Sequence, residues 1–212
     1  MPTDFLLSLP QLSGFLAVAV LVTLAPGPDN LMVLSLGMAR GRRSGVAFGL
    51  GCALGCVNHT LLAALGVSAL IAASPVAFVA LKIAGGAYLI WLGVQAIRNA
   101  RPVSAAAQVA GDAPRALFFK GLVANAINPK VVLFFLAFLP QFVDGARGHA
   151  GWQIAQLGLV FTFETVLIFG AIGWFAGSLG ERLARRPAIG TWLDRVAGSI
   201  FVALGLRLLV AR

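Results

Sequence analysis

The sequence predicts an all-α integral membrane protein with about six transmembrane helices, arranged as two inverted three-helix repeats with a broken first helix in each repeat. Three observations lead to this fold class. The 212 residues are 59% hydrophobic and 11% charged, whereas soluble domains average about 25% charged residues. The apolar residues fall into segments of about 20 residues or more, which is long enough for a helix to cross a bilayer. Prolines interrupt one such segment in each half of the chain.

Taken in order, the apolar segments predict spans at residues 12–36, 46–72, 75–97, 121–142, 152–179 and 189–210. We expect residues 1–98 to form the first three-helix repeat and residues 120–212 to form the second, within one membrane domain. Residues 99–119 contain consecutive alanines, Gly111 and two prolines, which favour a connecting loop between the repeats.

Basic residues cluster between apolar segments and predict the orientation. Because cytoplasmic loops carry an excess of Lys and Arg, the first, third and fifth connections are expected to face the cytoplasm, with both termini outside. Arg207 and Arg212 near the C-terminus count against this orientation. The net charge of +9 is therefore interpreted as a membrane-orientation signal, and no nucleic-acid partner is expected. The clusters are Arg40, Arg42 and Arg43; Arg98, Arg101, Arg115 and Lys120; and Arg182, Arg185 and Arg186.

Helix-breaking residues interrupt the first and the fourth apolar segments. Pro26, Gly27 and Pro28 lie in the first, and Pro129 lies in the fourth. A proline inside a helix costs about 3 kcal/mol, and the backbone groups that it frees are tolerated in a membrane only where protein or a water-filled cavity satisfies them. The pattern predicts a substrate-lined break in each half; the alternative is a simple proline kink.

The two halves resemble each other around these breaks. Residues 21–29 align with residues 122–130, which places Pro28 over Pro129. Since three helices is an odd number, a second copy would enter the membrane from the opposite side. Inverted repeats with discontinuous helices are typical of secondary transporters, whose substrate sites lie where the broken helices meet near the bilayer midplane.

Charged and amide side chains flank the breaks. Asp29 and Lys130 occupy equivalent positions, so a pseudo-two-fold axis would bring them close together. They could form a resting ion pair, or Asp29 could hold a substrate ammonium while Lys130 holds its carboxylate. The alternative is that both lie at half-helix ends and reach water. Asn30, Asn125 and Asn128 are expected to bind the freed backbone or the ligand.

Two further polar residues lie inside apolar segments and are candidates for proton coupling. Glu164 is surrounded by apolar residues, and His59 lies in the corresponding part of the second segment. Either side chain could carry a coupling proton, although a packing role is an equal alternative for His59. Cys52, Cys56 and His59 share a helix face, but only Cys56 and His59 are close enough to chelate an ion together. We expect no metal site and no cofactor.

Four stretches together resemble the LysE/RhtB family of bacterial amino-acid exporters: residues 25–30 (APGPDN), 37–45 (GMARGRRSG), 85–93 (GGAYLIWLG) and 125–130 (NAINPK). The similarity covers nearly the whole chain. It implies export of amino acids or their derivatives across the bacterial inner membrane, driven by the proton gradient or the membrane potential, without implying which amino acid. The motif residues carried over as substrate-binding candidates are Pro26, Gly27, Pro28, Asp29, Asn30, Asn128, Pro129 and Lys130.

The predicted function is a secondary exporter whose two halves rock around a central site, coupled to the proton gradient. No nucleophile elbow, zinc-protease signature or phosphate loop suggests an enzyme. One alternative is a metal-cation efflux carrier, which needs Cys56, His59, Asp29 and Glu164 to converge. Another is a membrane scaffold that transports nothing. The expected partners are an amino acid, protons and the lipid bilayer, and a homodimer would suit so small a carrier.

Overall fold

The computed structural model describes residues 6–67, 74–99 and 111–210, and the ordered elements in these ranges are all helical. This confirms the predicted all-α class. The first half contains α1 (Leu9–Leu24), α2 (Pro28–Arg40), α3 (Arg42–Leu62) with a π-helical turn η2 (Ala63–Val67), and α5 (Pro75–Arg98). The second contains α6 (Pro114–Ala126), α7 (Pro129–Leu133), η3 (Phe134–Phe138), η4 (Leu139–Phe142), η5 (Gly145–Arg147), α8 (Ala150–Trp174), α9 (Ala176–Arg185) and α10 (Pro187–Val210).

The predicted breaks interrupt one helix in each half. The axes of α1 and α2 differ by 56°, and those of α6 and the Pro129–Phe142 segment differ by 49°. By length and composition, 3 helices of the described chain can cross a membrane, or up to 5 if each bent pair is one span. The chain is thus a multi-pass membrane protein. The α10 helix is not among these candidates, so a count of six spans stays a prediction.

Several predicted boundaries differ from the structure. The fifth span was expected to reach residue 179, but α8 ends at Trp174 and a separate helix, α9, begins at Ala176. Helix α6 begins at Pro114, inside the predicted connector 99–119, most of which lies outside the described residues. The end of the second predicted span, residues 68–72, also lies outside them.

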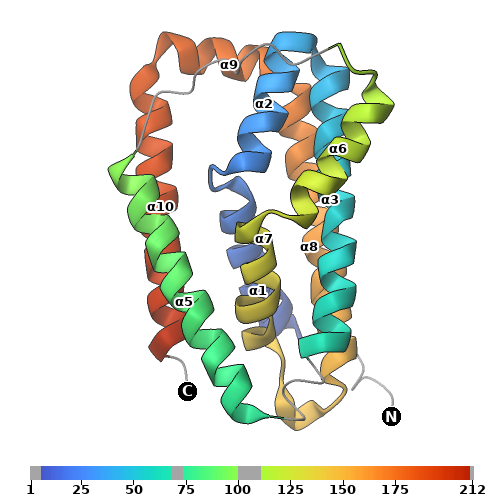
Figure 1. Ribbon diagram of the computed structural model, residues 1–212, viewed down its shortest axis with the longest axis vertical. Helices are drawn as coiled ribbons and strands as arrows, with labels where there is room; N and C mark the ends of the chain where they lie inside the picture. Colours follow the sequence, from blue (N-terminus) through green and yellow to red (C-terminus); the bar gives the residue numbers. More distant parts are fainter. Residues whose placement is uncertain (1–5, 68–73, 100–110, 211–212) are drawn as a thin grey trace.

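The two bent pairs run in opposite directions through the centre of the molecule (Figure 1). The first ascends from α1 to α2, and the second descends from α6 to α7. Helices α5 and α10 lie side by side on the left, α3 and α8 stand on the right, and α9 lies across the upper end. Helix α1 begins and α10 ends toward the lower end, whereas the basic residues at the end of α2 and in α9 lie at the upper end.

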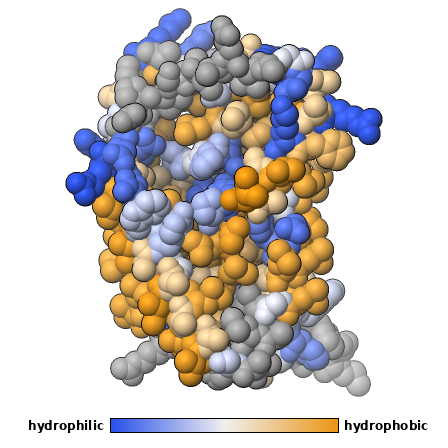
Figure 2. Space-filling view, viewed as in Figure 1, coloured by the Kyte–Doolittle hydropathy of each residue, from blue (hydrophilic) through white to orange (hydrophobic). Residues whose placement is uncertain are grey.

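Hydrophilic and hydrophobic residues are also divided between the upper end and the rest of the surface. In Figure 2 hydrophilic residues gather toward the upper end, and hydrophobic residues form a broad belt below them. Large apolar side chains such as Trp91, Leu159 and Phe163 are more than half exposed. This surface is what lipid would cover in a membrane protein.

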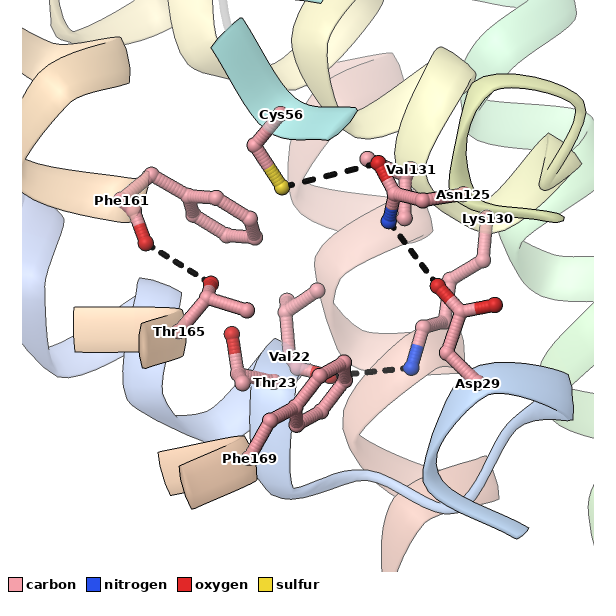
Figure 3. A pocket seen from close by; sticks show the side chains of 10 residues that line it. All are labelled: Val22, Thr23, Asp29, Cys56, Asn125, Lys130, Val131, Phe161, Thr165 and Phe169. Atoms are coloured by element: carbon pink, nitrogen blue, oxygen red, sulfur yellow. Dashed lines mark hydrogen bonds between the residues drawn. The ribbon is translucent and has the colours of Figure 1, made fainter. Parts of the chain in front are cut away.

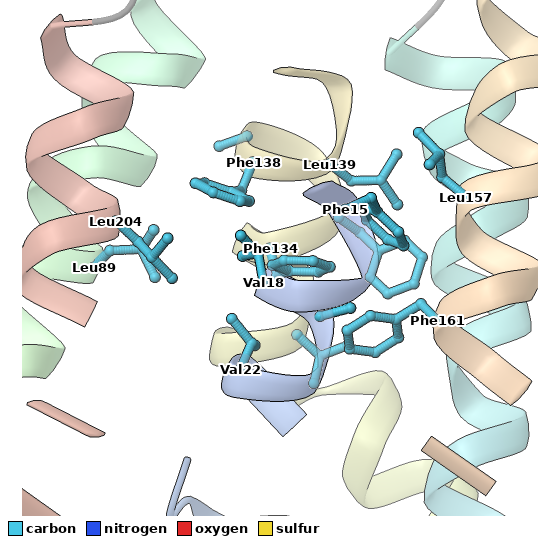
Figure 4. Packing of buried hydrophobic residues seen from close by; sticks show 14 of the residues in the cluster. Phe15, Val18, Val22, Leu89, Phe134, Phe138, Leu139, Leu157, Phe161 and Leu204 are labelled. Carbon is cyan, nitrogen blue, oxygen red and sulfur yellow. The ribbon is translucent and has the colours of Figure 1, made fainter. Parts of the chain in front are cut away.

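Aromatic side chains fill the core on the lower side of the breaks. Phe15 of α1, Phe134 of η3 and Phe161 of α8 are buried and pack against one another, with ring centroids 4.8 Å apart for Phe134 and Phe161 and 6.1 Å apart for Phe15 and Phe134. Leu89 of α5 and Leu204 of α10 belong to the same cluster (Figure 4). Packed aromatic and aliphatic side chains therefore form the core on this side of the breaks.

Glycines bring neighbouring helices into close contact. A Cβ on Gly93 of α5 would lie 2.4 Å from the Gly198 oxygen of α10, and a Cβ on Gly198 would lie 2.5 Å from the Gly93 oxygen. A similar reciprocal contact joins α3 to α6, where Gly51 meets the Phe118 backbone and Gly121 meets the Phe48 backbone. These pairs of helices can approach only because the contact positions carry no side chain.

Candidate functional site

The first break exposes backbone oxygens at the carboxyl end of α1. In a continuous helix the Val22 carbonyl would accept from the N–H of residue 26, but Pro26 has no N–H. Instead, the Lys130 ammonium donates to the Val22 oxygen at 3.2 Å and to the Ala25 oxygen at 3.0 Å. A side chain from the second half of the chain therefore satisfies the Val22 carbonyl that Pro26 frees and the Ala25 carbonyl that the end of α1 leaves open.

An amide side chain completes this arrangement. Asn30 Nδ2 donates to the Thr23 carbonyl at 2.6 Å, while its Oδ1 lies 3.5 Å from Lys130 Nζ. Asn30 is buried in the first turn of α2. One of the two roles predicted for this residue, binding the freed backbone, is what it does here.

The second break is satisfied from within the helix bundle. Pro129 cannot donate to the Asn125 carbonyl, which accepts from the Asn128 N–H at 3.0 Å and lies 3.1 Å from His59 Nε2. Because a carbonyl only accepts, Nε2 is the protonated nitrogen in this contact. Asn128 Oδ1 then accepts from the Lys130 N–H at 3.0 Å and caps α7. His59 thus fills the backbone position that Pro129 leaves open.

A small cavity of about 10 Å³ lies between the two breaks, which is room for roughly one water molecule. Figure 3 shows its lining. Asp29 accepts from Asn125 Nδ2 at 2.9 Å, and Cys56 Sγ lies 3.7 Å from Asn125 Oδ1. Asp29 and Lys130 are 3% and 7% exposed, so both are buried and neither extends to the molecular surface as the alternative required. The polar lining residues are Thr23, Asp29, Cys56, Asn125, Lys130 and Thr165.

Asp29 and Lys130 border the same cavity without forming an ion pair. The carboxylate accepts from Asn125, and the ammonium donates to backbone and amide oxygens. Of the two arrangements predicted for these charges, the resting ion pair is therefore absent in this conformation.

A larger pocket of about 220 Å³ lies on the other side of Lys130. One wall carries residues of both breaks, and the opposite wall comes from α5 and α10. Lys130 lines both cavities. Asn128 Nδ2 is buried and has no hydrogen-bond partner within the described ranges. The lining residues are Pro26, Gly27, Pro28, Asn128, Pro129 and Lys130 from the breaks, and Leu92, Gln95, Ala96 and Phe201 from the opposite wall.

Glu164 lies behind the wall of the small cavity. Its Oε1 accepts from the Thr23 hydroxyl at 2.5 Å and lies 3.5 Å from the Thr165 hydroxyl. Its Oε2 is buried without a partner among the residues that the structure describes. The two threonines connect Glu164 to the cavity that Asp29 and Lys130 border.

Several residues that line the two cavities were not predicted from the sequence. Thr23 and Gln95 are polar residues within apolar segments, and this signal could have identified them. Ala96 and Phe201 are apolar residues in apolar helices, so nothing local distinguishes them. They line the pocket because α5 and α10 pack opposite the breaks.

The metal-carrier alternative depends on a convergence of ligands. Cys56 and Asp29 do border one cavity. Within the described ranges, however, no three His, Cys, Asp or Glu side chains come close enough together to hold a metal ion. The four residues that this alternative requires are not assembled in this conformation.

Known proteins match the part of the chain that contains all the site residues. A family described as LysE type translocator matches residues 20–212. An uncharacterized membrane protein of Vibrio cholerae is 35% identical, over 94% of this chain and 96% of its own length. A homoserine/homoserine lactone efflux protein of Salmonella typhimurium is 30% identical over 94% of this chain and 96% of its own length. A threonine efflux protein of Escherichia coli is 30% identical over 93% of this chain and 98% of its own length. No solved structure matches the chain.

Proposed function

Because the chain belongs to the LysE type translocator family, we propose that it exports amino acids or amino-acid derivatives across the bacterial cytoplasmic membrane by alternating access, coupled to the proton gradient. The family and its efflux relatives make the chain a membrane transporter and not an enzyme. The observation that carries the proposal is the pocket of about 220 Å³ that residues of both helix breaks line, opposite a wall formed by α5 and α10. It is smaller than the sites of drug-sized ligands, and it suits a small solute.

The charges around the pocket match the two charged ends of an amino acid. Lys130 can receive the carboxylate, assisted by the unpaired Nδ2 of Asn128 and by the positive end of the α2 helix dipole. Asp29, at the adjoining cavity, supplies the negative charge that an ammonium group requires. A neutral scaffold would have no need for two buried charges of opposite sign, which are costly inside a membrane.

Alternating access is supported by the way the two halves are built. The bent pairs run in opposite directions, as inverted repeats would (Figure 1). Helices α5 and α10 contact each other through reciprocal glycines, Gly93 with Gly198 and Gly86 with Gly205. Equivalent helices that pack through matching positions are expected around a pseudo-two-fold axis. We propose that the halves rock about this axis while the site stays at the breaks.

Proton coupling is assigned to Glu164, with His59 as a second candidate. Glu164 is 5% exposed, and one of its oxygens has no partner in the described part of the chain, so it can bind a proton without losing a hydrogen bond. Its contact with Thr23 reaches the cavity beside Lys130. His59 reaches the same region through the Asn125 backbone.

The proposed orientation places the basic upper end of Figure 1 in the cytoplasm and both termini outside. The positive-inside bias supports it, because the basic residues of the first and fifth connections gather at this end. The proposed partners are the amino acid, protons and the bilayer of the inner membrane. A homodimer is compatible with so small a carrier.

The test is export of a labelled amino-acid mixture from dipeptide-loaded cells that produce either the wild type or Asp29→Asn at equal membrane abundance. Asp112→Asn is the matched control, because Asp112 pairs with Lys120 away from the breaks. We expect particular amino acids to leave faster with the wild type and the control, but not with Asp29→Asn. If no amino acid leaves faster with the wild type, in cells where a known exporter scores positive, the proposal is wrong.

Coupling is tested separately in proteoliposomes with an imposed pH gradient. Glu164→Gln should lose the acceleration that the gradient gives while keeping exchange of substrate across the membrane. A variant that still responds to the gradient would remove Glu164 from the coupling step and leave His59 as the candidate.

A further inference from the structure

The ammonium of Lys130 occupies a set of three oxygens that fits a primary ammonium. A primary ammonium has three N–H donors and no acceptor. Its neighbours here are the Ala25 oxygen at 3.0 Å, the Val22 oxygen at 3.2 Å and Asn30 Oδ1 at 3.5 Å. All three come from the first half of the chain, whereas Lys130 comes from the second. The oxygens therefore form a site, and Lys130 is its occupant in this conformation.

The surroundings of this site favour a cation. Two of the oxygens lie at the carboxyl end of α1, a helix of 16 residues, where the helix dipole is negative. The freed carbonyls of broken membrane helices are where secondary transporters coordinate cations. Asp29 lies in the next turn of chain and borders the same small cavity. The electrostatic surroundings thus favour a positive group there, whether it is Lys130 or another cation.

The larger pocket offers the Lys130 side chain space next to the site. This side chain is a flexible stem with a compact charged end, and it lines the larger pocket as well as the small cavity. Its ammonium lies 5.8 Å from the centre of the Phe201 ring on the opposite wall of that pocket, within the range of a cation–π contact. A short movement of the stem would bring the ammonium into the larger pocket.

We propose that the carboxyl end of α1 is a binding subsite for a primary ammonium group, which Lys130 fills in the empty carrier and which the α-ammonium of the transported amino acid takes over. The proposal rests on the proposed function for its substrate. The displaced Lys130 ammonium then turns toward the pocket and binds the substrate carboxylate. The Lys130 ammonium therefore fills the subsite of the substrate ammonium before binding, and it binds the substrate carboxylate afterwards.

The test uses the purified Lys130→Ala protein and methylammonium, a primary ammonium without a carboxylate. Because a ligand that binds only the folded state raises its stability, methylammonium chloride should raise the unfolding temperature of Lys130→Ala by about 2–4 °C. Tetramethylammonium chloride at the same concentration has no N–H donor and should not. The wild type, whose subsite is filled, should respond equally little to both salts.

Two further proteins make the result decisive. Lys120→Ala is the matched control, because it removes a lysine that pairs with Asp112 outside the site, and methylammonium should leave it unchanged relative to tetramethylammonium. Lys130→Met retains most of the apolar stem and is used with ammonium chloride if Lys130→Ala does not fold. Recovery of folded Lys130→Met only in the presence of ammonium ions supports the subsite, and failure to recover it with them overturns the subsite.

The outcomes separate this inference from the proposed function, because thermal stability requires no transport. If amino acids are exported but methylammonium and tetramethylammonium affect Lys130→Ala equally, the subsite is wrong and the exporter remains. If methylammonium stabilises Lys130→Ala but no amino acid is exported by the wild type, the subsite stands and the proposed substrate is wrong.

Discussion

The two helix breaks have the same cause but differ in what satisfies them. At the first, the freed oxygens of Val22 and Ala25 accept from the flexible side chain of Lys130. At the second, the freed oxygen of Asn125 accepts from the neighbouring backbone and contacts the ring of His59. A lysine stem can move away and be replaced by a ligand, whereas a backbone turn and a packed ring cannot. The first break is therefore suited to binding and the second to support.

The two breaks also differ in how closely the chain packs around them. The second break follows α6, which is pressed against α3 so closely that a Cβ on Gly121 would lie 2.2 Å from the Phe48 oxygen. At the first break, the three atoms nearest to a Cβ on Gly27 would all belong to the side chain of Lys130, with Nζ nearest at 2.9 Å. The helix before the second break is therefore packed against backbone, whereas the nearest neighbour of Gly27 at the first break is the end of a side chain.

Restoring a backbone donor at the first break should have the largest effect. In Pro26→Ala the new N–H can donate to the Val22 oxygen and compete with Lys130, so export per folded molecule should fall by about tenfold or more. Pro129→Ala is the counterpart at the second break, where the Asn125 oxygen already has its partners. Export and membrane abundance are measured together for both. Equal losses in the two variants would contradict the division of roles.

A side chain at the α3–α6 contact should destabilise the support of the second break. In Gly121→Ala the new methyl meets backbone, which cannot move aside, so the free energy of unfolding should fall by about 3 kcal/mol. Gly170→Ala is the control, because a Cβ there has no neighbour within 4 Å. Reversible unfolding in mixed micelles measures both. An unchanged Gly121→Ala would mean that α3 and α6 separate at little cost.

Removing the histidine should weaken the second break without stopping transport. In His59→Leu the Asn125 oxygen loses its side-chain partner, at a cost of about 1–2 kcal/mol. His59→Gln keeps an N–H donor and should regain part of that stability. Export per folded molecule should persist in both. If His59→Gln is stable but no longer responds to a pH gradient, the histidine carries a proton, and its role exceeds support.

The smallest effect is expected from Gly27→Ala at the first break. Gly27 has φ −166°, which any residue adopts, and the methyl would push against the movable end of Lys130. The free energy of unfolding should change by less than about 0.5 kcal/mol, while export falls by about threefold. This is the reverse of Gly121→Ala. A stability loss as large as that of Gly121→Ala would show that Lys130 is held as firmly as backbone.

The local signals in the sequence predict the helices and the breaks well. Proline and charge inside an apolar segment are costly wherever the chain folds, so Pro26, Asp29 and Pro129 indicate a site before any partner is known. The hydrogen-bond partners of these residues are harder to predict from the sequence. The sequence predicted an ion pair as one option for Lys130, but its contacts are oxygens at the end of α1. Which acceptor lies nearest depends on how the two bent helices cross.

Helix ends were less predictable for a related reason. The apolar residues after Trp174 favour a longer fifth span, yet from Ala176 onward they belong to α9, whose Leu183 packs in one cluster with Leu34 of α2. That contact joins segments far apart in the sequence. The opposite wall of the larger pocket, with Gln95 and Phe201, likewise arises from the packing of α5 and α10.

The position of Cys56 provides a natural chemical reporter. It is one of two cysteines in the chain, both are buried, and Cys56 borders the cavity beside Asp29. A water-soluble thiol reagent can reach this sulfur only when a path to the breaks is open. In a Cys52→Ala background, labelling of Cys56 from one side of the membrane or the other would therefore record which face of the carrier is open, without any introduced cysteine.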